Sequence, residues 1–195
     1  MPEYIEYSDN SNCHFNGSNS ILNNLSISSE EWKDWTIFCV FKNVTTSSRT
    51  QAIFTLTQEN AKSNTLIGFF ADTTYILGSG TGYRFSIANN DNESENHLFL
   101  QEELDTNKHI AEFSSNNGVI NCWLDGNHTI IDENDFRPKT IGEINVGSRW
   151  VNGKFGYYAH QLDAHLVRLI IFNRNLTNDE RTFVRNLINE QHDVY

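Results

Sequence analysis

The sequence predicts an all-β fold, an antiparallel β-sandwich of the jelly-roll type with one short C-terminal helix. Short segments in which hydrophobic and polar residues alternate recur along the 195 residues, and turn-forming residues separate them. A helical pattern of apolar residues occurs only near the C-terminus. Many short strands with few helices are typical of sandwiches and jelly rolls.

The expected strands follow one another at short intervals and are rich in β-branched and aromatic residues. They are residues 3–7, 36–44, 51–58, 66–74, 83–89, 109–115, 118–131, 140–149 and 165–172. Segment 118–131 predicts a hairpin, because Asp125-Gly126 favours a tight primed turn. Segment 165–172 is the most hydrophobic, which predicts a central strand.

The closing helix has a clear start signal. Thr177 and Glu180 have the spacing of a capping box. An apolar stripe is expected to pack on the sandwich, with Arg181 and Arg185 on the other faces. The stripe consists of Phe183, Val184, Leu187 and Ile188.

The chain is predicted to be one domain, residues 13–195, preceded by an arm or an edge strand at residues 1–12. Trp32 and Trp35 are expected to anchor its core. Cys13, Cys39 and Cys122 are too widely spaced to indicate a disulfide framework or a zinc motif. Small buried thiols are the simplest interpretation.

Several segments follow the order and spacing of a known family. They are FNGSNSIL from Phe15, DWTIFCVFK, HIAEFSSNNGVINCWLDGN, TIGEINVGSR and the closing IIFNRNLTNDE. Together they resemble the laminin G-like and pentraxin-like group of concanavalin A-like jelly rolls, over about residues 13 to 190. The resemblance implies this fold and the binding of sugars or protein surfaces, often with calcium. The family often has Gly-x-Ile-Asp-Glu-Val before the last strand. Here Val167-Arg168 replaces the acidic pair, so no role of those carboxylates carries over.

Composition argues against several partners. The formal net charge of −11 would repel the phosphates of nucleic acids and anionic membrane surfaces. No apolar run approaches the roughly 20 residues of a membrane span. The N-terminal residues show no basic stretch followed by an apolar one, so no secretory signal is visible.

A glycoside hydrolase of this fold would need paired carboxylates. Two stretches begin a Glu-x-Asp-x-x-Glu pattern, one at Glu103 and Asp105 and one at Glu133 and Asp135, but neither has the final Glu. Both stretches are polar, and solvated surface charges are the simpler interpretation. We therefore expect no catalytic activity.

The sequence does not assemble a metal site. His160, Asp163 and His165 are the best transition-metal candidates, but no further ligand is identifiable, and polar residues leading into a core strand are the simpler interpretation. Loop oxygens could serve calcium, although nothing brings them together. These donors are Asp72, Asp125, Asn127, Asp132 and Asn134. We expect no cofactor, with calcium left open.

The favoured ligand site is an aromatic and polar cluster between two predicted strands, where loops often carry function. It comprises Arg149, Trp150, Asn152, Tyr157, Tyr158 and His160. Trp150 would be the platform for a sugar ring, although packing under its own loop or in an oligomer contact is the competing interpretation. A second cluster contains Trp123 with Asp125 and Asn127, but sheet-face packing is favoured for Trp123.

These features predict a non-catalytic recognition or adhesion module that binds a glycan or cell-surface polysaccharide. The missing export signal suggests a virion protein made in the host cytoplasm, such as a head decoration, head fibre or tail-associated protein. Such a protein would contact capsid or tail proteins. The alternative location is the cytoplasm. A divergent glycoside hydrolase or lyase, or a purely structural assembly protein, are the alternative functions. Homo-oligomers or a larger assembly are expected, because weak sugar sites gain affinity through multivalency.

Overall fold

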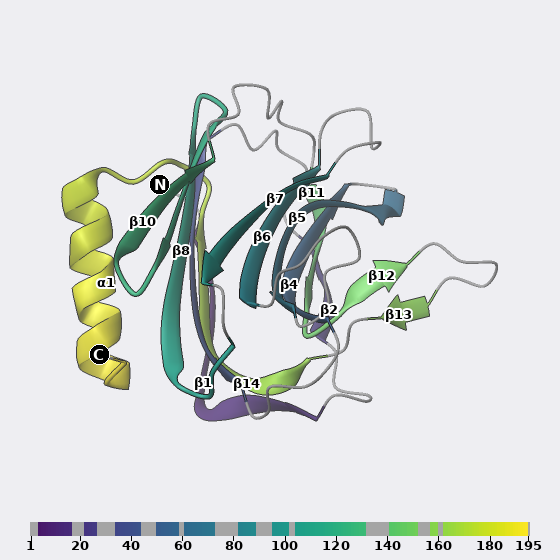
Figure 1. Cartoon of the computed structure of the whole chain (residues 1–195), viewed down its shortest axis with the longest axis horizontal. Helices are drawn as coiled ribbons and strands as arrows, with labels where there is room; N and C mark the ends of the chain where they lie inside the picture. Colours follow the sequence, from purple (N-terminus) through teal and green to yellow (C-terminus); the bar gives the residue numbers. More distant parts are fainter. Residues whose placement is uncertain are drawn as a thin grey trace.

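The computed structural model is a sandwich of two six-stranded antiparallel sheets with a helix packed outside it (Figure 1). The all-β prediction with one C-terminal helix is confirmed. The structure describes residues 4–16, 22–26, 34–43, 50–58, 61–72, 82–88, 95–101, 104–131, 141–151, 157–159 and 162–194.

The first sheet, which we call sheet A, has the strand order β1-β14-β3-β8-β9-β10. Its strands are β1 (Tyr4–Asn16), β3 (Trp35–Asn43), β8 (Lys108–Asn116), β9 (Val119–Leu124), β10 (Asn127–Ile131) and β14 (Asp163–Phe172). The hydrophobic β14 lies inside the sheet, between β1 and β3, as its composition predicts. The edge strand β1 crosses the predicted boundary at residue 12, and the division of the chain at that point stays a prediction.

The second sheet, sheet B, has the order β2-β11-β4-β5-β6-β7. Its strands are β2 (Leu22–Ser26), β4 (Gln51–Gln58), β5 (Ala61–Asp72), β6 (Gly82–Ala88), β7 (Glu95–Gln101) and β11 (Ile141–Val146). A separate two-stranded hairpin joins β12 (Arg149–Val151) to β13 (Tyr157–Ala159). Figure 1 shows this hairpin on the side of sheet B that faces away from sheet A.

The core lies between the two sheets and is strongly aromatic. The rings of Phe85 and Phe113 stack with centroids 4.4 Å apart, and Phe113 also contacts Phe54 and Phe69. Trp35 is fully buried, which confirms it as a core anchor, whereas Trp32 lies outside the described residues. Aromatic pairs of this kind bury a large apolar area and add about 1 kcal/mol each beyond that burial.

The predicted turn after β9 and two of the predicted buried thiols are present in the structure. Asp125 and Gly126 both have positive φ angles, 50° and 80°, so β9 and β10 are joined by the predicted primed turn. Cys39 and Cys122 are buried and unbridged, as expected, and burial raises the pKa of both thiols. They are therefore unreactive core residues. Nothing is described for the side chain of Cys13.

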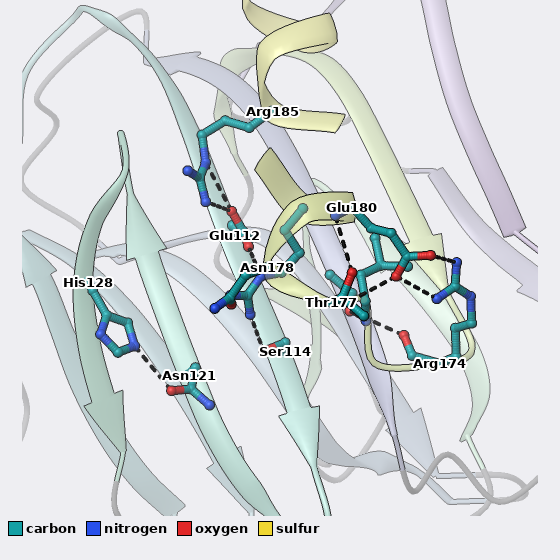
Figure 2. A network of polar contacts seen from close by, with 12 residues as sticks. Glu112, Ser114, Asn121, His128, Arg174, Thr177, Asn178, Glu180 and Arg185 are labelled. Carbon is teal, nitrogen blue, oxygen red and sulfur yellow. Dashed lines mark hydrogen bonds and ion pairs between the residues drawn. The ribbon is translucent and has the colours of Figure 1, made fainter. Parts of the chain in front are cut away.

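Helix α1 (Asn178–His192) begins at the predicted capping box. Thr177 Oγ1 accepts a hydrogen bond from the backbone N–H of Glu180, and the Glu180 carboxylate accepts one from the backbone N–H of Thr177. Arg174 donates two further hydrogen bonds to this carboxylate, at 2.9 and 2.7 Å (Figure 2). These hydrogen bonds lower the pKa of Glu180 to about 2.

The face that α1 turns toward sheet A differs from the prediction. Val184 and Ile188 pack on the apolar outer face of the sheet, but Phe183 is 69% exposed and Leu187 is 41% exposed. The four apolar residues therefore do not form one buried stripe, and that prediction was wrong.

A buried carboxylate explains the rotation of the helix. Glu112 on β8 points to the outer face of sheet A, where it is only 1% exposed. Arg185 binds one of its oxygens at 2.5 and 3.1 Å (Figure 2). Arg181 Nε lies 3.0 Å from the other oxygen, in an ion pair without hydrogen-bond alignment. A buried carboxylate requires such countercharges. Arg181 and Arg185 therefore take the part of the inward helix face that Phe183 and Leu187 were predicted to occupy.

The only helix among the described residues, α1, is neither long nor apolar enough to span a membrane.

Candidate functional site

The predicted aromatic cluster forms a hairpin outside sheet B. Trp150 lies directly opposite Tyr158 in the β12–β13 ladder, and Val151 lies opposite Tyr157. Arg149 pairs with Ala159 at the base of the ladder. The structure thus brings four of the predicted ligand-binding residues together on one short element. Asn152 and His160 lie outside the described residues.

A row of three polar residues and one glycine crosses the outer face of sheet B, on the side of the hairpin. The core-facing residues of these strands are apolar, and the residues that alternate with them point outward. The cross-strand register aligns four of these positions, which we call the polar row. The polar row consists of Asn145, Thr55, Gly68 and Ser86. Strand β12 lies within contact distance of β4 and β5, which carry the middle of this row.

Asn145 is the most unusual member of the polar row. Its side chain is 1% exposed, yet neither Nδ2 nor Oδ1 has a hydrogen-bond partner in the described part of the chain. The same holds for the buried hydroxyl of Ser148, whose carbonyl oxygen accepts a hydrogen bond from Thr55 Oγ1 at 3.3 Å. An unsatisfied buried polar group costs about 1–3 kcal/mol. Folded proteins rarely retain such groups without a reason, so they mark a candidate site.

Arg84 lies next to the polar row. Its guanidinium carbon lies 4.5 Å from the centroid of the Phe70 ring, and Nη1 donates a hydrogen bond of 2.5 Å to Ser86 Oγ. Arg84 sits opposite Phe70 on the neighbouring strand and is 6% exposed. The outer face of sheet B therefore holds amide, hydroxyl and guanidinium groups, on the side where the hairpin lies. These are groups that bind hydroxyls and carboxylates of a ligand.

Sequence reasoning missed the polar row and Arg84. Alternating polar residues such as Thr55, Arg84 and Asn145 are ordinary for a strand with one solvated face, so the pattern carries no signal for a site. Their burial on the outer face is a tertiary property. The available signal was the amide of Asn145 inside the apolar run INV, which favours no particular ligand.

In the second predicted aromatic cluster, the ring of Trp123 is covered by neighbouring side chains. Trp123 is 8% exposed, His128 stacks on its ring at 4.7 Å, and Arg181 covers it at 4.1 Å. His128 also hydrogen-bonds Asn121 at 3.1 Å (Figure 2). Sheet-face packing of Trp123 is therefore confirmed. Asp125, its predicted polar neighbour, is engaged elsewhere.

Asp105 and Asp125 meet on a buried histidine. His109 Nδ1 lies 2.6 Å from Asp125 Oδ2, and His109 Nε2 lies 2.7 Å from Asp105 Oδ1. Two carboxylates can both accept hydrogen bonds only from a ring that is protonated on both nitrogens. Burial alone would lower the pKa of His109, but the hydrogen bonds to Asp125 and Asp105 outweigh it and raise the pKa above 6.5.

The histidine clamp, Asp105–His109–Asp125, is braced from the core. Asn43 donates a hydrogen bond of 2.8 Å to the hydroxyl of Tyr83, which donates in turn to the backbone carbonyl of Asp105 at 3.3 Å. Burial of Asp105 opposes ionisation, but the hydrogen bonds from His109 and Asn107 lower its pKa. Asp105 is thus held by internal partners. Glu103, Glu133 and Asp135, the other predicted carboxylates, lie outside the described residues.

Neither the transition-metal prediction nor the calcium prediction gains support from the described residues. Within the described ranges, no three His, Cys, Asp or Glu side chains are arranged to hold a metal ion. Asp163 and His165 lie two apart on β14, as expected, while His160 is outside the described residues. Of the calcium donors, Asp125 is bound to His109, Asn127 begins β10, and Asp72 ends β5. Asp132 and Asn134 are outside the described residues.

Comparison with known proteins identifies the fold. No protein-family model matches the sequence, and no curated protein matches it. Among solved structures, the Ruminococcus gnavus IT-sialidase CBM40 bound to α2,3-sialyllactose is 14% identical, with a TM-score of 0.62 over 93% of this chain and 95% of that chain. A native heptameric SAP-like pentraxin from Limulus polyphemus is 12% identical, with a TM-score of 0.61 over 86% of this chain and 77% of that chain.

A larger protein contains a similar domain. The NanB sialidase from Streptococcus pneumoniae, as its K499G mutant, is 16% identical with a TM-score of 0.66. The match covers 91% of this chain but 27% of the sialidase, so the chain spans about a quarter of that protein. These likenesses establish the fold. The chain has a concanavalin A-like jelly-roll fold, as the sequence resemblance indicated.

Proposed function

We propose that the chain is a non-catalytic carbohydrate-binding module whose ligand lies between the β12–β13 hairpin and the polar row of sheet B. The observation that carries this proposal is the amide of Asn145, which is buried and unpartnered within the described chain on the outer face of sheet B. A side-chain amide can donate to one sugar hydroxyl and accept from its neighbour. Trp150 and Tyr158, paired on the hairpin, would supply the aromatic surface for the ring.

Two further observations support binding rather than catalysis. Asp105, the one described member of the predicted carboxylate pairs, is held by His109 and Asn107 at 2.7 and 2.8 Å, and this leaves it poorly placed to act as a free acid or nucleophile. The CBM40 domain of similar size was solved with sialyllactose bound. Sialyllactose carries a carboxylate, and among the described residues Arg149 on β12 and Arg84 on β6 are cations that could pair with such a group.

A glycan array tests the proposal, run with sialylated and neutral glycans, each with and without calcium. We expect wild-type protein to bind a defined set of glycans. We expect Trp150→Ala and Asn145→Leu to lose at least roughly tenfold in affinity for that set, since each removes a contact at the centre of the proposed site. Phe183→Ala is the matched control, because it removes an exposed aromatic ring from the opposite side of the sandwich.

The outcomes separate the alternatives. Unchanged binding by both site variants would reject this site. Cleavage of an array glycan by wild-type protein, abolished by Glu103→Gln with Asp105→Asn, would favour the divergent hydrolase or lyase. No hit together with stable self-association would favour a structural assembly protein. A virion location with capsid or tail contacts stays a sequence-based prediction, which mass spectrometry of purified particles would test.

A further inference from the structure

Helix α1 presents an apolar pair to solvent. Phe183 and Leu187 are the large hydrophobic residues that the described chain leaves exposed, at 69% and 41%. They lie four residues apart and therefore one above the other on the same helix face. Asp179 precedes this pair by one turn and Glu190 follows it, both exposed. We call Asp179, Phe183, Leu187 and Glu190 the outer stripe.

The helix that carries the outer stripe is fastened along its length. Arg181 and Arg185 hold its inner face to Glu112, and Ile188 is buried against sheet A. At its C-terminal end, Lys108 on β8 donates to the carbonyl oxygen of His192. A partner of the outer stripe would therefore meet a preformed helix and lose little free energy to ordering it.

The charged residues of the outer stripe, Asp179 and Glu190, are both acidic. Both arginines within α1 point toward the sheet. Two arginines outside α1, Arg168 and Arg174, donate hydrogen bonds to Gln191 and Glu180 of the helix respectively. A second copy of this chain would bring the same carboxylates against the stripe, and each copy has a formal net charge of −11. Like charges across an interface disfavour that pairing.

We propose that the outer stripe docks a basic amphipathic helix of a different protein. Phe183 and Leu187 would enter the apolar seam of that helix, in the manner of anchors spaced by one helical turn. Lysine or arginine residues flanking the seam would pair with Asp179 and Glu190. This surface lies on the side of the sandwich opposite the proposed sugar site, so the two functions can be tested separately.

Isothermal titration with synthetic peptides tests this surface in the intact chain. The probe is an amphipathic leucine–lysine peptide, and the matched peptide has glutamate in place of lysine. We expect saturable binding of the lysine peptide and none of the glutamate peptide. Phe183→Ser with Leu187→Ser should weaken binding by roughly tenfold or more, and so should Asp179→Lys with Glu190→Lys. Thr182→Ser, an exposed change on the same helix, is the control.

Three results would overturn the proposal. The first is no binding of the lysine peptide to wild-type protein. The second is binding to the double-serine variant within about twofold of wild type, because attraction would then reflect only the net charge. The third is a wild-type dimer in analytical ultracentrifugation that the double-serine variant abolishes, since a second copy would then be the occupant. Circular dichroism of each variant checks that the fold is retained, as the exposure of both side chains leads us to expect.

Discussion

The outer faces of sheets A and B both carry buried side chains, but those of sheet A are mainly apolar and those of sheet B mainly polar. The described outer face of sheet A is largely apolar, and a buried carboxylate on it, Glu112, is paired with two arginines of α1. The outer face of sheet B carries hydroxyl, amide and guanidinium groups, and the amide of Asn145 has no partner within the described chain. The first face follows the rules for stability. The second departs from them, which is expected where a surface is kept for a ligand.

The largest expected effect comes from breaking the paired charges on sheet A. Glu112→Ala leaves Arg181 and Arg185 facing each other without a countercharge in a largely buried site. Removing one partner of a buried ion pair costs about 3–5 kcal/mol of unfolding free energy. Urea denaturation of the variant and wild type measures this cost.

A compensated variant provides the control for that experiment. Replacing Glu112 by Leu together with Arg181 and Arg185 by Met removes all the charges at once. Apolar replacement of a whole buried ion network is often neutral or stabilising. We therefore expect most of the lost stability to return. A cost for Glu112→Ala below about 1 kcal/mol would contradict the fastening role assigned to this carboxylate.

The next effect in size concerns pH and the histidine clamp at the end of sheet A. The pKa of His109 is raised above 6.5 in the folded chain by Asp125 and Asp105. Its stabilising contribution is therefore fully present below 6.5 and disappears as pH rises through the raised pKa. Unfolding free energy measured by urea at a series of pH values should fall across that window.

Asp125→Asn should flatten this pH dependence, because an amide no longer favours the charged imidazole. Below pH 6.5 we expect the variant to lose about 2 kcal/mol, the scale of a hydrogen bond to a charged group. Asparagine tolerates the positive φ of 50° at this position, so the turn itself is retained. A His109 ring that titrates at or below 6.5 in NMR spectra of wild-type protein would contradict this account.

The smallest expected effect has the opposite sign and lies on sheet B. Asn145→Leu removes two buried polar atoms that have no partner among the described residues, and it should stabilise the fold by about 1 kcal/mol. The same substitution is expected to weaken glycan binding. Thermal and urea unfolding measure the first effect. A loss of stability greater than about 1 kcal/mol would show that Asn145 serves the fold, and would remove the observation that supports the sugar site.

Much of the fold could be predicted because its signals are local. The β-branched and aromatic apolar run TIFCVFKNV and the alternation in YRFSIAN each predict a strand from neighbouring residues alone. The primed turn at Asp125-Gly126 and the capping box at Thr177 each depend on a few neighbouring residues, and both are present. The rotation of α1 was mispredicted, because it depends on Glu112, which lies far from the helix in the sequence.

The candidate site was predictable only in part. The aromatic cluster from Arg149 to Tyr158 stood out by composition, and the ladder of β12 and β13 pairs its members. The partners of Asp105 and Asp125 did not stand out. His109 lies 4 residues from Asp105 and 16 residues from Asp125. The pairing of β8 with β9 is what brings Asp125 to the histidine ring.

The sequence by itself determined most of the strands, the closing helix and the double-layered jelly-roll fold, whereas β7 (Glu95–Gln101) was not predicted. It did so because alternation and capping act between neighbours along the chain. Only the tertiary structure decided which side of α1 meets the sheet, which carboxylates share a histidine, and which polar residues are buried outside sheet B. Alternation states which residues share a face of a strand, but what covers that face depends on segments distant in sequence.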